Sequence, residues 1–279
     1  MTKHNSGISR RSILQAAAAF PLLPAAARAP VKDYVLMVFT NPIPGKEAEY
    51  NDFYEHRHMP DVASVPGFVR AQRFKLAVPQ LRAGSPPLPD YMVFYQITTD
   101  YLAGVFAEVD SRLTRGVTRF EPVMDRNGMA AHTFEALGPA IPHAGAVESP
   151  DWRQHFLQLV YSNPAPGMAA AYNQWYDHVH APEVVSSPDF VSARRYKRTD
   201  VQLVPNSTTN YLAVFKISTP DFAATVRKFQ AGAPHETMSK AFDGKSGGGY
   251  SYQAIGPEIR GDDIRAQHLA RSGVSLDKL

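Results

Sequence analysis

The stretch "YEHRHMPDV" (Tyr54–Val62) recurs as "YDHVHAPEV" (Tyr176–Val184), and both read tyrosine, acid, histidine, any residue, histidine, any residue, proline, acid, valine. The match extends outward: residues 40–75 align with residues 162–197 at a constant offset of 122 and without a gap, and about half of the positions are identical. A repeat of this length indicates an internal duplication. Its period is the size of a domain, which excludes solenoids and propellers with repeats of about 20–50 residues.

Each copy predicts the same order of elements: strand, helix, strand, strand, helix, strand. The first strand is an apolar run, "YVLMVF" (Tyr34–Phe39) in one copy and "FLQLVY" (Phe156–Tyr161) in the other. The first helix should run from Lys46 to the residue before Pro60, because proline disfavours helical backbone at the position ahead of it. This order is that of the ferredoxin-like β-α-β-β-α-β unit.

A single unit of this kind leaves one face of its sheet bare, and the second copy can cover it. We therefore expect an α+β fold in which two tandem ferredoxin-like βαββαβ units pack sheet to sheet as an intrachain α+β barrel, with the helices outside. The expected boundaries are a signal peptide at 1–27, an N-terminal domain at 30–140, a linker at 140–152, a C-terminal domain at 153–259 and a polar tail at 260–279.

The first 27 residues have the composition of an export signal. A basic head, "SRRSILQ" (Ser9–Gln15), precedes the short apolar run "AAAAFPLLPAAA" and small residues suited to cleavage. The pair Arg10 and Arg11 resembles that of a bacterial twin-arginine signal. We expect cleavage after Ala27 and a periplasmic or secreted location; a plain secretion signal or a retained anchor is the alternative.

Composition excludes several kinds of site and partner. The chain has no cysteine, which excludes disulfides, thiolate metal sites and cysteine nucleophiles. The formal net charge is +3, and Lys3, Arg10 and Arg11 of the signal supply all of it. The remaining chain is neutral and offers no electrostatic footprint for a nucleic acid.

The first helix of each copy carries tyrosine or tryptophan and then "HMP" (His58–Pro60) or "HAP" (His180–Pro182), which resembles EthD-like proteins of the dimeric α+β barrel superfamily. The resemblance covers essentially the whole chain after the signal, one domain per half. It implies that the pairing made by two chains in those proteins occurs within one chain here. We expect no cofactor; some relatives in this superfamily bind haem, but only histidines without partners would support haem here.

Two tyrosines and a histidine in the first helix follow the spacing i, i+4 and i+8, so they share one face. They are Tyr50, Tyr54 and His58 in the first copy and Tyr172, Tyr176 and His180 in the second. Such a face offers aromatic walls, phenolic donors and one imidazole, which suits a pocket that holds a small oxygenated molecule and moves a proton on it. We expect the histidine to be the acid/base group, with the second tyrosine beside it and the first orienting the substrate.

Other roles stay open for these histidines. His58 could instead cap the C-terminus of the helix, where an imidazolium interacts favourably with the last carbonyls, and the tyrosines would then only pack. The pairs His56/His58 and His178/His180 suggest a metal, but histidines two residues apart share a face on a strand and not on a helix. We therefore expect no metal, with His56 pointing away, near Asp52.

Two further pairs at matching positions complete the candidate substrate-binding residues: Arg73 and Arg195 in the second strands, and Asn41 and Asn163 at the ends of the first strands. A guanidinium in a buried sheet could hold a substrate carboxylate or phenolate. The alternative is a structural ion pair with Asp61 or Glu183 near the end of the helix.

The expected function is that of an exported, cofactor-independent lyase, dehydratase or isomerase that transfers protons on a small phenolic, polyketide-like or lactone substrate. A non-catalytic periplasmic binding or stability module and a cofactor-independent monooxygenase are the alternatives. The expected partner is the small molecule, with no nucleic acid and no membrane span after cleavage, and the fused barrel could form a homodimer. We expect the N-terminal pocket to be the main site, because Arg57 could add a charge beside it, whereas the second copy has Val179 at the matching position.

Changing Arg10 and Arg11 together to lysine should block export, because the receptor of the twin-arginine route reads the arginine pair as an address. Fractionation of cells that express the variant and the parent would measure this. N-terminal sequencing of the exported parent should give a start near Arg28. Undiminished export of the double variant would point to the general secretion pathway.

Overall fold

Each half of the chain folds in the order that its hydrophobic pattern predicts. The computed structural model describes residues 29–82, 85–204, 209–232 and 238–272, and the expected signal peptide lies outside the described residues. The first half consists of β1 (Lys32–Pro42), α1 (Glu47–Phe53), a π-helical turn (Tyr54–His58), α2 (Met59–Ala63), β2 (Phe68–Leu76), β3 (Tyr91–Thr99), α3 (Leu102–Thr114) and β4 (Met124–Ala136).

The second half repeats this order and adds short elements at both ends. It consists of β5 (Ile141–Pro142), a 3-10 turn (Trp152–Gln154), β6 (His155–Ser162), α4 (Ala169–Trp175), a π-helical turn (Tyr176–His180), α5 (Ala181–Val185), β7 (Phe190–Arg198), β8 (Tyr211–Ser218), α6 (Phe222–Gly232), β9 (Gly248–Ala254), β10 (Ile259–Arg260) and α7 (Gly261–Ser272). Part of the expected polar tail is therefore a helix. Arg265 fixes α7 to the first half through the carbonyls of Val65 and Phe68, at 3.2 and 3.4 Å.

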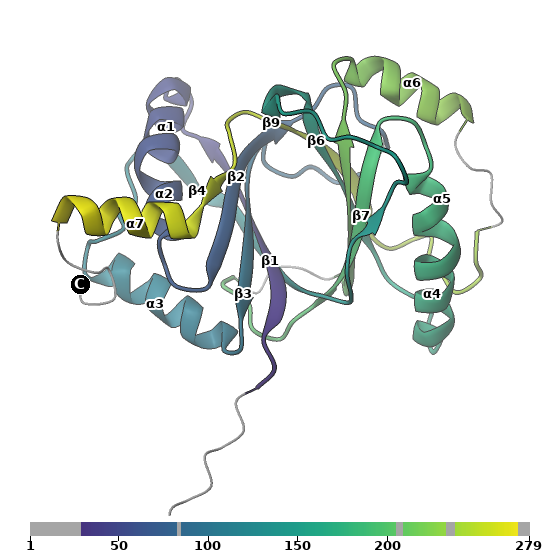
Figure 1. The fold of residues 1–279 in the computed structure, drawn as a ribbon, viewed down its shortest axis with the longest axis horizontal. Coiled ribbons are helices and arrows are strands. Elements are labelled where there is room, and N and C mark those ends of the chain that lie inside the picture. Colours follow the sequence, from purple (N-terminus) through teal and green to yellow (C-terminus); the bar gives the residue numbers. More distant parts are fainter. Residues whose placement is uncertain (1–28, 83–84, 205–208, 233–237, 273–279) are drawn as a thin grey trace, which may run out of the picture.

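Within the described residues, eight antiparallel strands close into one barrel in the order β2-β3-β1-β4-β7-β8-β6-β9, with β9 pairing back to β2. The halves join where Phe134–Ala136 of β4 pair with Tyr196–Arg198 of β7, and where Phe74–Leu76 of β2 pair with Tyr252–Ala254 of β9. The two sheets are thus one continuous closed sheet rather than separate stacked layers. The predicted α+β barrel is confirmed at this level, with α1, α2, α3 and α7 on one side and α4, α5 and α6 on the other (Figure 1).

Alternation along the strands divides the apolar residues into three layers. One side of each strand fills the barrel with residues such as Phe39, Phe134, Leu159 and Tyr252. The opposite side packs against the helices of its own half in two further clusters, one for each half. The first strands carry apolar residues on both faces because both faces are covered.

The first helix of each half continues past its proline, where the sequence analysis predicts that it ends. The π-helical turn closes with a bond from the N–H of Met59 to the carbonyl of Tyr54, and α2 then runs to Ala63. Proline breaks an α-helix because it lacks an N–H and its ring meets the carbonyl four residues earlier. The wider turn shifts the hydrogen-bond register, so that Pro60 falls in the first turn of α2, where a missing N–H costs no bond.

Two glutamines tie each half to the last strand of the other. Gln80, after β2, accepts from the N–H of Ser251 at 2.7 Å and donates to its carbonyl at 3.0 Å. Gln202, after β7, makes the same pair of bonds with Thr133 at 3.0 and 2.7 Å. The loops that follow β2 and β7 are thereby fixed on the opposite half.

None of the helices within the described ranges is long and apolar enough to cross a membrane.

Residues 30–140 expressed alone should aggregate or form a homodimer that imitates the fused barrel. The fragment would expose the apolar inner face of its sheet and leave β2 and β4 as unpaired edges, which are sites of association. Size-exclusion chromatography with light scattering would give its mass, with the whole chain as the control. A soluble, stable monomer of the fragment would contradict the requirement for a second half.

Candidate functional site

A cavity lies between the π-turn helix and the outer face of the sheet in each half. The N-terminal pocket has a volume of about 190 Å³, and its lining includes Tyr54, His58, Tyr95, Phe120, Arg126 and Leu203. The C-terminal pocket has a volume of about 210 Å³, and its lining includes Arg82, Gln158, Tyr176, His180, Phe215 and Phe242. The second tyrosine and the histidine of each motif therefore lie together at a cavity.

The π-helical turn sets the contact between these two rings. The ring centroids of Tyr54 and His58 are 5.1 Å apart in an edge-on arrangement, and those of Tyr176 and His180 are 4.8 Å apart. Turns of this kind occur frequently at functional sites. His56 points away from the cavity and lies 3.1 Å from the carboxylate of Asp52, as predicted.

His58 is buried in an almost wholly apolar environment, with an exposed fraction of 8%. Its ring stacks on Phe53 at 5.3 Å and lies 5.5 Å from Phe120. Burial lowers the pKa of His58 to about 4, so the imidazole is neutral at pH 7. Its Nδ1 atom is buried and has no hydrogen-bond partner within the part of the chain that the structure describes.

The alternative role of His58 as a C-terminal helix cap does not fit this geometry. The helix continues for five more residues, through α2, so His58 is not at its end. A capping imidazolium would also have to be charged, whereas burial lowers the pKa of this group.

His180 has the same chemical character in the second half. Its ring stacks on Trp175 at 4.7 Å. Burial is the main cause that lowers the pKa of His180 to about 4; Arg195 also lowers it, and Glu183 acts in the opposite direction. Both pockets thus present a neutral imidazole at pH 7.

The first tyrosine of each motif lies behind the pocket. The hydroxyl of Tyr50 bonds Thr40 Oγ1 at 2.6 Å, and that of Tyr172 bonds Ser162 Oγ at 2.6 Å. Tyr54 reaches the same threonine at 3.2 Å, and burial raises its pKa, so its phenol stays protonated at neutral pH. The structure therefore brings the second tyrosine, and not the first, to the cavity.

The two repeated arginines lie under the tyrosines and line neither of the two pockets. Arg73 donates to Asn51 Oδ1 at 2.7 Å, and its guanidinium lies 5.2 Å from the ring of Tyr54. Arg195 pairs with Asp177 at 2.7 Å and lies 4.4 Å from the ring of Tyr176. Neither hydrogen-bonds Asp61 or Glu183, the expected ion-pair partners; each supports its tyrosine through a cation–π contact.

The repeated asparagines hold loops. Asn41 Oδ1 accepts from the N–H of Asp90 at 2.8 Å, and Asn163 Oδ1 accepts from the N–H of Asn210 at 2.7 Å. Each bond secures the last residue of a loop that crosses to the opposite half. These loops bring Leu81 and Arg82 to the C-terminal pocket and Leu203 and Val204 to the N-terminal pocket.

These crossing loops are the part of the site that the sequence analysis missed. A signal was present, because "QL" occurs at Gln80–Leu81 and again at Gln202–Leu203, at the offset of the repeat. The proline-rich context of the first loop indicated only irregular structure.

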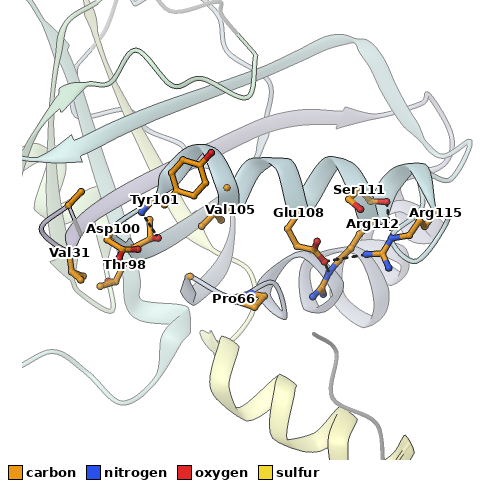
Figure 2. A pocket seen from close by; sticks show the side chains of 14 residues that line it. Val31, Pro66, Thr98, Asp100, Tyr101, Val105, Glu108, Ser111, Arg112 and Arg115 are labelled. Carbon is orange, nitrogen blue, oxygen red and sulfur yellow. Dashed lines mark hydrogen bonds and ion pairs between the residues drawn. The ribbon is translucent and has the colours of Figure 1, made fainter. Parts of the chain in front are cut away.

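A larger groove runs along the outside of α3 in the first half and contains none of the predicted site residues (Figure 2). Three of its charged groups pair with one another: Glu108 bonds Arg112 at 2.7 Å and Arg115 at 3.3 Å. Arg112 also donates to Ser64 at 2.8 Å. These contacts join α3 to the end of α2 and give the groove a structural role.

The residues of the two pockets do not fit a haem or a metal ion. Apolar cavities of about 150 Å³ hold one benzene ring, so cavities of 190 and 210 Å³ are too small for a porphyrin. Among the described residues, no three histidine, aspartate or glutamate side chains gather as metal ligands. The geometry instead suits a small uncharged ring.

Comparison with known proteins identifies the fold. No protein-family model matches the chain, and no curated protein matches it in sequence. An anthrone oxidase-like protein of solved structure is 11% identical, with a TM-score of 0.54 over 83% of this chain and 97% of that one. Chlorite dismutase from Candidatus Nitrospira defluvii is 13% identical, with a TM-score of 0.47 over 84% of this chain and 93% of that one. The chain shares its fold with the anthrone oxidase-like protein, and its own strand order defines that fold as a closed antiparallel barrel covered by helices.

Proposed function

We propose that the protein is an exported enzyme that, without a cofactor, moves a proton on a small oxygenated ring compound bound in the N-terminal pocket. The observation that carries the proposal is His58, which lines an apolar cavity as a neutral imidazole and whose buried Nδ1 has no hydrogen-bond partner among the described residues. A buried polar atom without a partner costs about 1–3 kcal/mol, and a bound ligand can supply the missing bond.

The tautomer of His58 follows from its surroundings. A hydrogen bond with the backbone of Arg119 acts to raise the pKa, as expected when a ring N–H donates to a carbonyl. Nδ1 has no partner among the described residues, so we place the N–H of the neutral ring on the other nitrogen and the lone pair on Nδ1 as part of the proposal. Nδ1 is therefore the atom that takes a proton from the substrate.

The remaining groups fit a reaction that creates an oxyanion. His58 takes a proton from a carbon next to a carbonyl or from a phenolic oxygen, and the negative charge moves to the substrate oxygen. The phenol of Tyr95 and the guanidinium of Arg126 are donors among the residues that line the pocket, whereas the hydroxyl of Tyr54 already donates to Met124 Sδ at 3.1 Å. Return of the proton to another atom gives an isomerase; its delivery to a leaving group gives a lyase or dehydratase.

The volume limits the substrate. A cavity of about 190 Å³ accommodates a phenolic, polyketide-like or lactone compound of one ring, or of two small rings. The wall residues Leu36, Val62 and Val109 are apolar, so a heavily charged substrate is disfavoured.

We further propose that the two halves are tandem ferredoxin-like, EthD-like units that arose by duplication. The same π-helical turn in both halves supports this origin, because such turns are rare. A cofactor-independent monooxygenase is the second candidate function, and the name of the anthrone oxidase-like neighbour favours it.

His58→Ala should lower proton-transfer activity about 10²–10⁴-fold, the usual effect of removing a general acid or base. The measurement is exchange of the acidic C–H protons of the aryl lactone 2-coumaranone in D₂O, followed by NMR. His180→Ala should reduce the rate less, because the N-terminal pocket is the proposed main site.

His56→Ala is the matched control, because this histidine is exposed and faces Asp52, and it should leave the rate unchanged. Exchange no faster than in imidazole buffer would contradict proton transfer. Full activity of His58→Ala with a large fall in melting temperature would show a structural role instead.

Stability should fall as the pH drops from about 6.5 to 4. The folded-state pKa of His58 is about 4, below the ordinary 6.5, so the unfolded state binds more protons in this window and stability rises with pH. At 1.36 kcal/mol per pKa unit, His58 contributes about 3 kcal/mol above pH 6.5 that is lost by pH 4.

Urea denaturation of the wild type and of His58→Phe at several pH values would measure this contribution. Phenylalanine keeps the ring against Phe53 but does not titrate, so the variant should lose less stability across the window than the wild type. Equal pH dependence of the two proteins would mean that His58 has an ordinary pKa.

A further inference from the structure

The C-terminal pocket contains a buried amide that has no counterpart in the N-terminal pocket. Gln158 of β6 lines the C-terminal pocket and has an exposed fraction of 5%. The matching position in the first half is Leu36, which lines the N-terminal pocket. An amide at an apolar cavity costs free energy unless its hydrogen-bonding groups are used.

A chain of hydrogen bonds fixes the orientation of this amide. The N–H of Leu81 donates to Ser251 Oγ at 3.2 Å, which leaves the serine its own proton to donate. That proton goes to Gln158 Oε1 at 2.5 Å. The oxygen end of the amide therefore faces Ser251, and the NH₂ group lies at the other end.

The NH₂ group of Gln158 keeps donor capacity. It donates to the carbonyl of Leu159 at a long 3.3 Å. An amide nitrogen carries two hydrogens, so at least one remains available. A Cβ atom at position 249 would lie 2.9 Å from this nitrogen, so Gly249 provides the room for it.

The strand register shows that this arrangement is a matched set. Gln158 pairs with Ser251, and Gly249 pairs with Val160. The same register in the first half gives Leu36 opposite Thr133 and Ala131 opposite Val38. Without an amide to bond, Thr133 Oγ1 is buried with no hydrogen-bond partner in the described residues. The C-terminal half thus has the amide, the hydroxyl that orients it and the glycine that makes room, whereas the N-terminal half has a hydroxyl at Thr133 but neither the amide nor the glycine.

We propose that the C-terminal pocket binds a small aromatic ketone or aldehyde whose carbonyl oxygen accepts a hydrogen bond from Gln158. An amide N–H donates only, so it selects an oxygen acceptor over a hydrocarbon. Phe215 and Phe242 form part of the cavity wall, and about 210 Å³ accommodates one substituted ring. The proposed site concerns ligand binding only and needs no proton transfer at His58. The binding proposal can therefore be correct if the proposed function is wrong, and the proposed function can be correct if the binding proposal is wrong.

The test compares acetophenone with ethylbenzene, which replaces the carbonyl by a methylene group. Binding to the full-length protein is followed through the NMR signals of the His180 ring, because His180 lines this pocket, and of the Gln158 side-chain amide. Acetophenone should shift both sets of signals. Gln158→Leu should weaken acetophenone binding about 2- to 10-fold, as expected for one hydrogen bond, and leave ethylbenzene binding unchanged or stronger.

Gln158→Leu copies the residue that the protein already has at position 36, opposite a hydroxyl, so the fold should tolerate it; the melting temperature checks this. Ser251→Ala is the second variant, and it should lose part of the preference for acetophenone because the amide is no longer oriented. Unchanged acetophenone binding in Gln158→Leu, equal loss for both probes, or no shift of His180 signals with either probe would each overturn the proposal.

Discussion

Closure of the sheet is the constraint on which both pockets depend. Two antiparallel contacts of three residue pairs each, β4 with β7 and β2 with β9, turn the two halves into one barrel. The apolar inner face of each half is buried only in this closed form. Gln80 and Gln202 add side-chain bonds to the backbone of the opposite half, and the loops that carry them supply walls of the two cavities. A half taken alone would therefore lose its partner sheet and part of its binding site together.

Inside this barrel, desolvation decides the chemistry of the repeated histidine in each half. The π-helical turn lets the helix pass its proline and keeps the ring of His58 or His180 against the preceding tyrosine. Aromatic neighbours exclude water, and the pKa of each imidazole falls to about 4. Arg73 and Arg195 lie behind the tyrosines, outside the cavities. Arg195 contributes to the lowered pKa of His180, whereas Arg73 is not a cause of the lowered pKa of His58.

The sequence predicts much of this architecture because the repeat and the hydrophobic alternation are local patterns. The order of elements follows from the hydrophobic pattern, the α+β barrel from the need to cover the bare face of each sheet, and the shared face of Tyr54 and His58 from their spacing. Three features do not. The passage of the helix through Pro60 depends on a π-helical turn, which proline rules do not anticipate. The roles of Arg73 and Asn41 depend on partners from other elements, Asn51 and Asp90. The crossing loops depend on barrel closure, which joins residues 171 positions apart at Gln80 and Ser251 and 69 positions apart at Gln202 and Thr133.

Covalent linkage of the two halves has a consequence for how such a site can change. In a homodimer with twofold symmetry, every substitution appears in both pockets at once, so the two must stay identical. In a single chain, codon 36 and codon 158 mutate separately, and the leucine and glutamine there already differ. One cavity can therefore drift toward a new ligand while its twin preserves the original binding. A single chain can therefore contain two related sites whose residues change independently of each other.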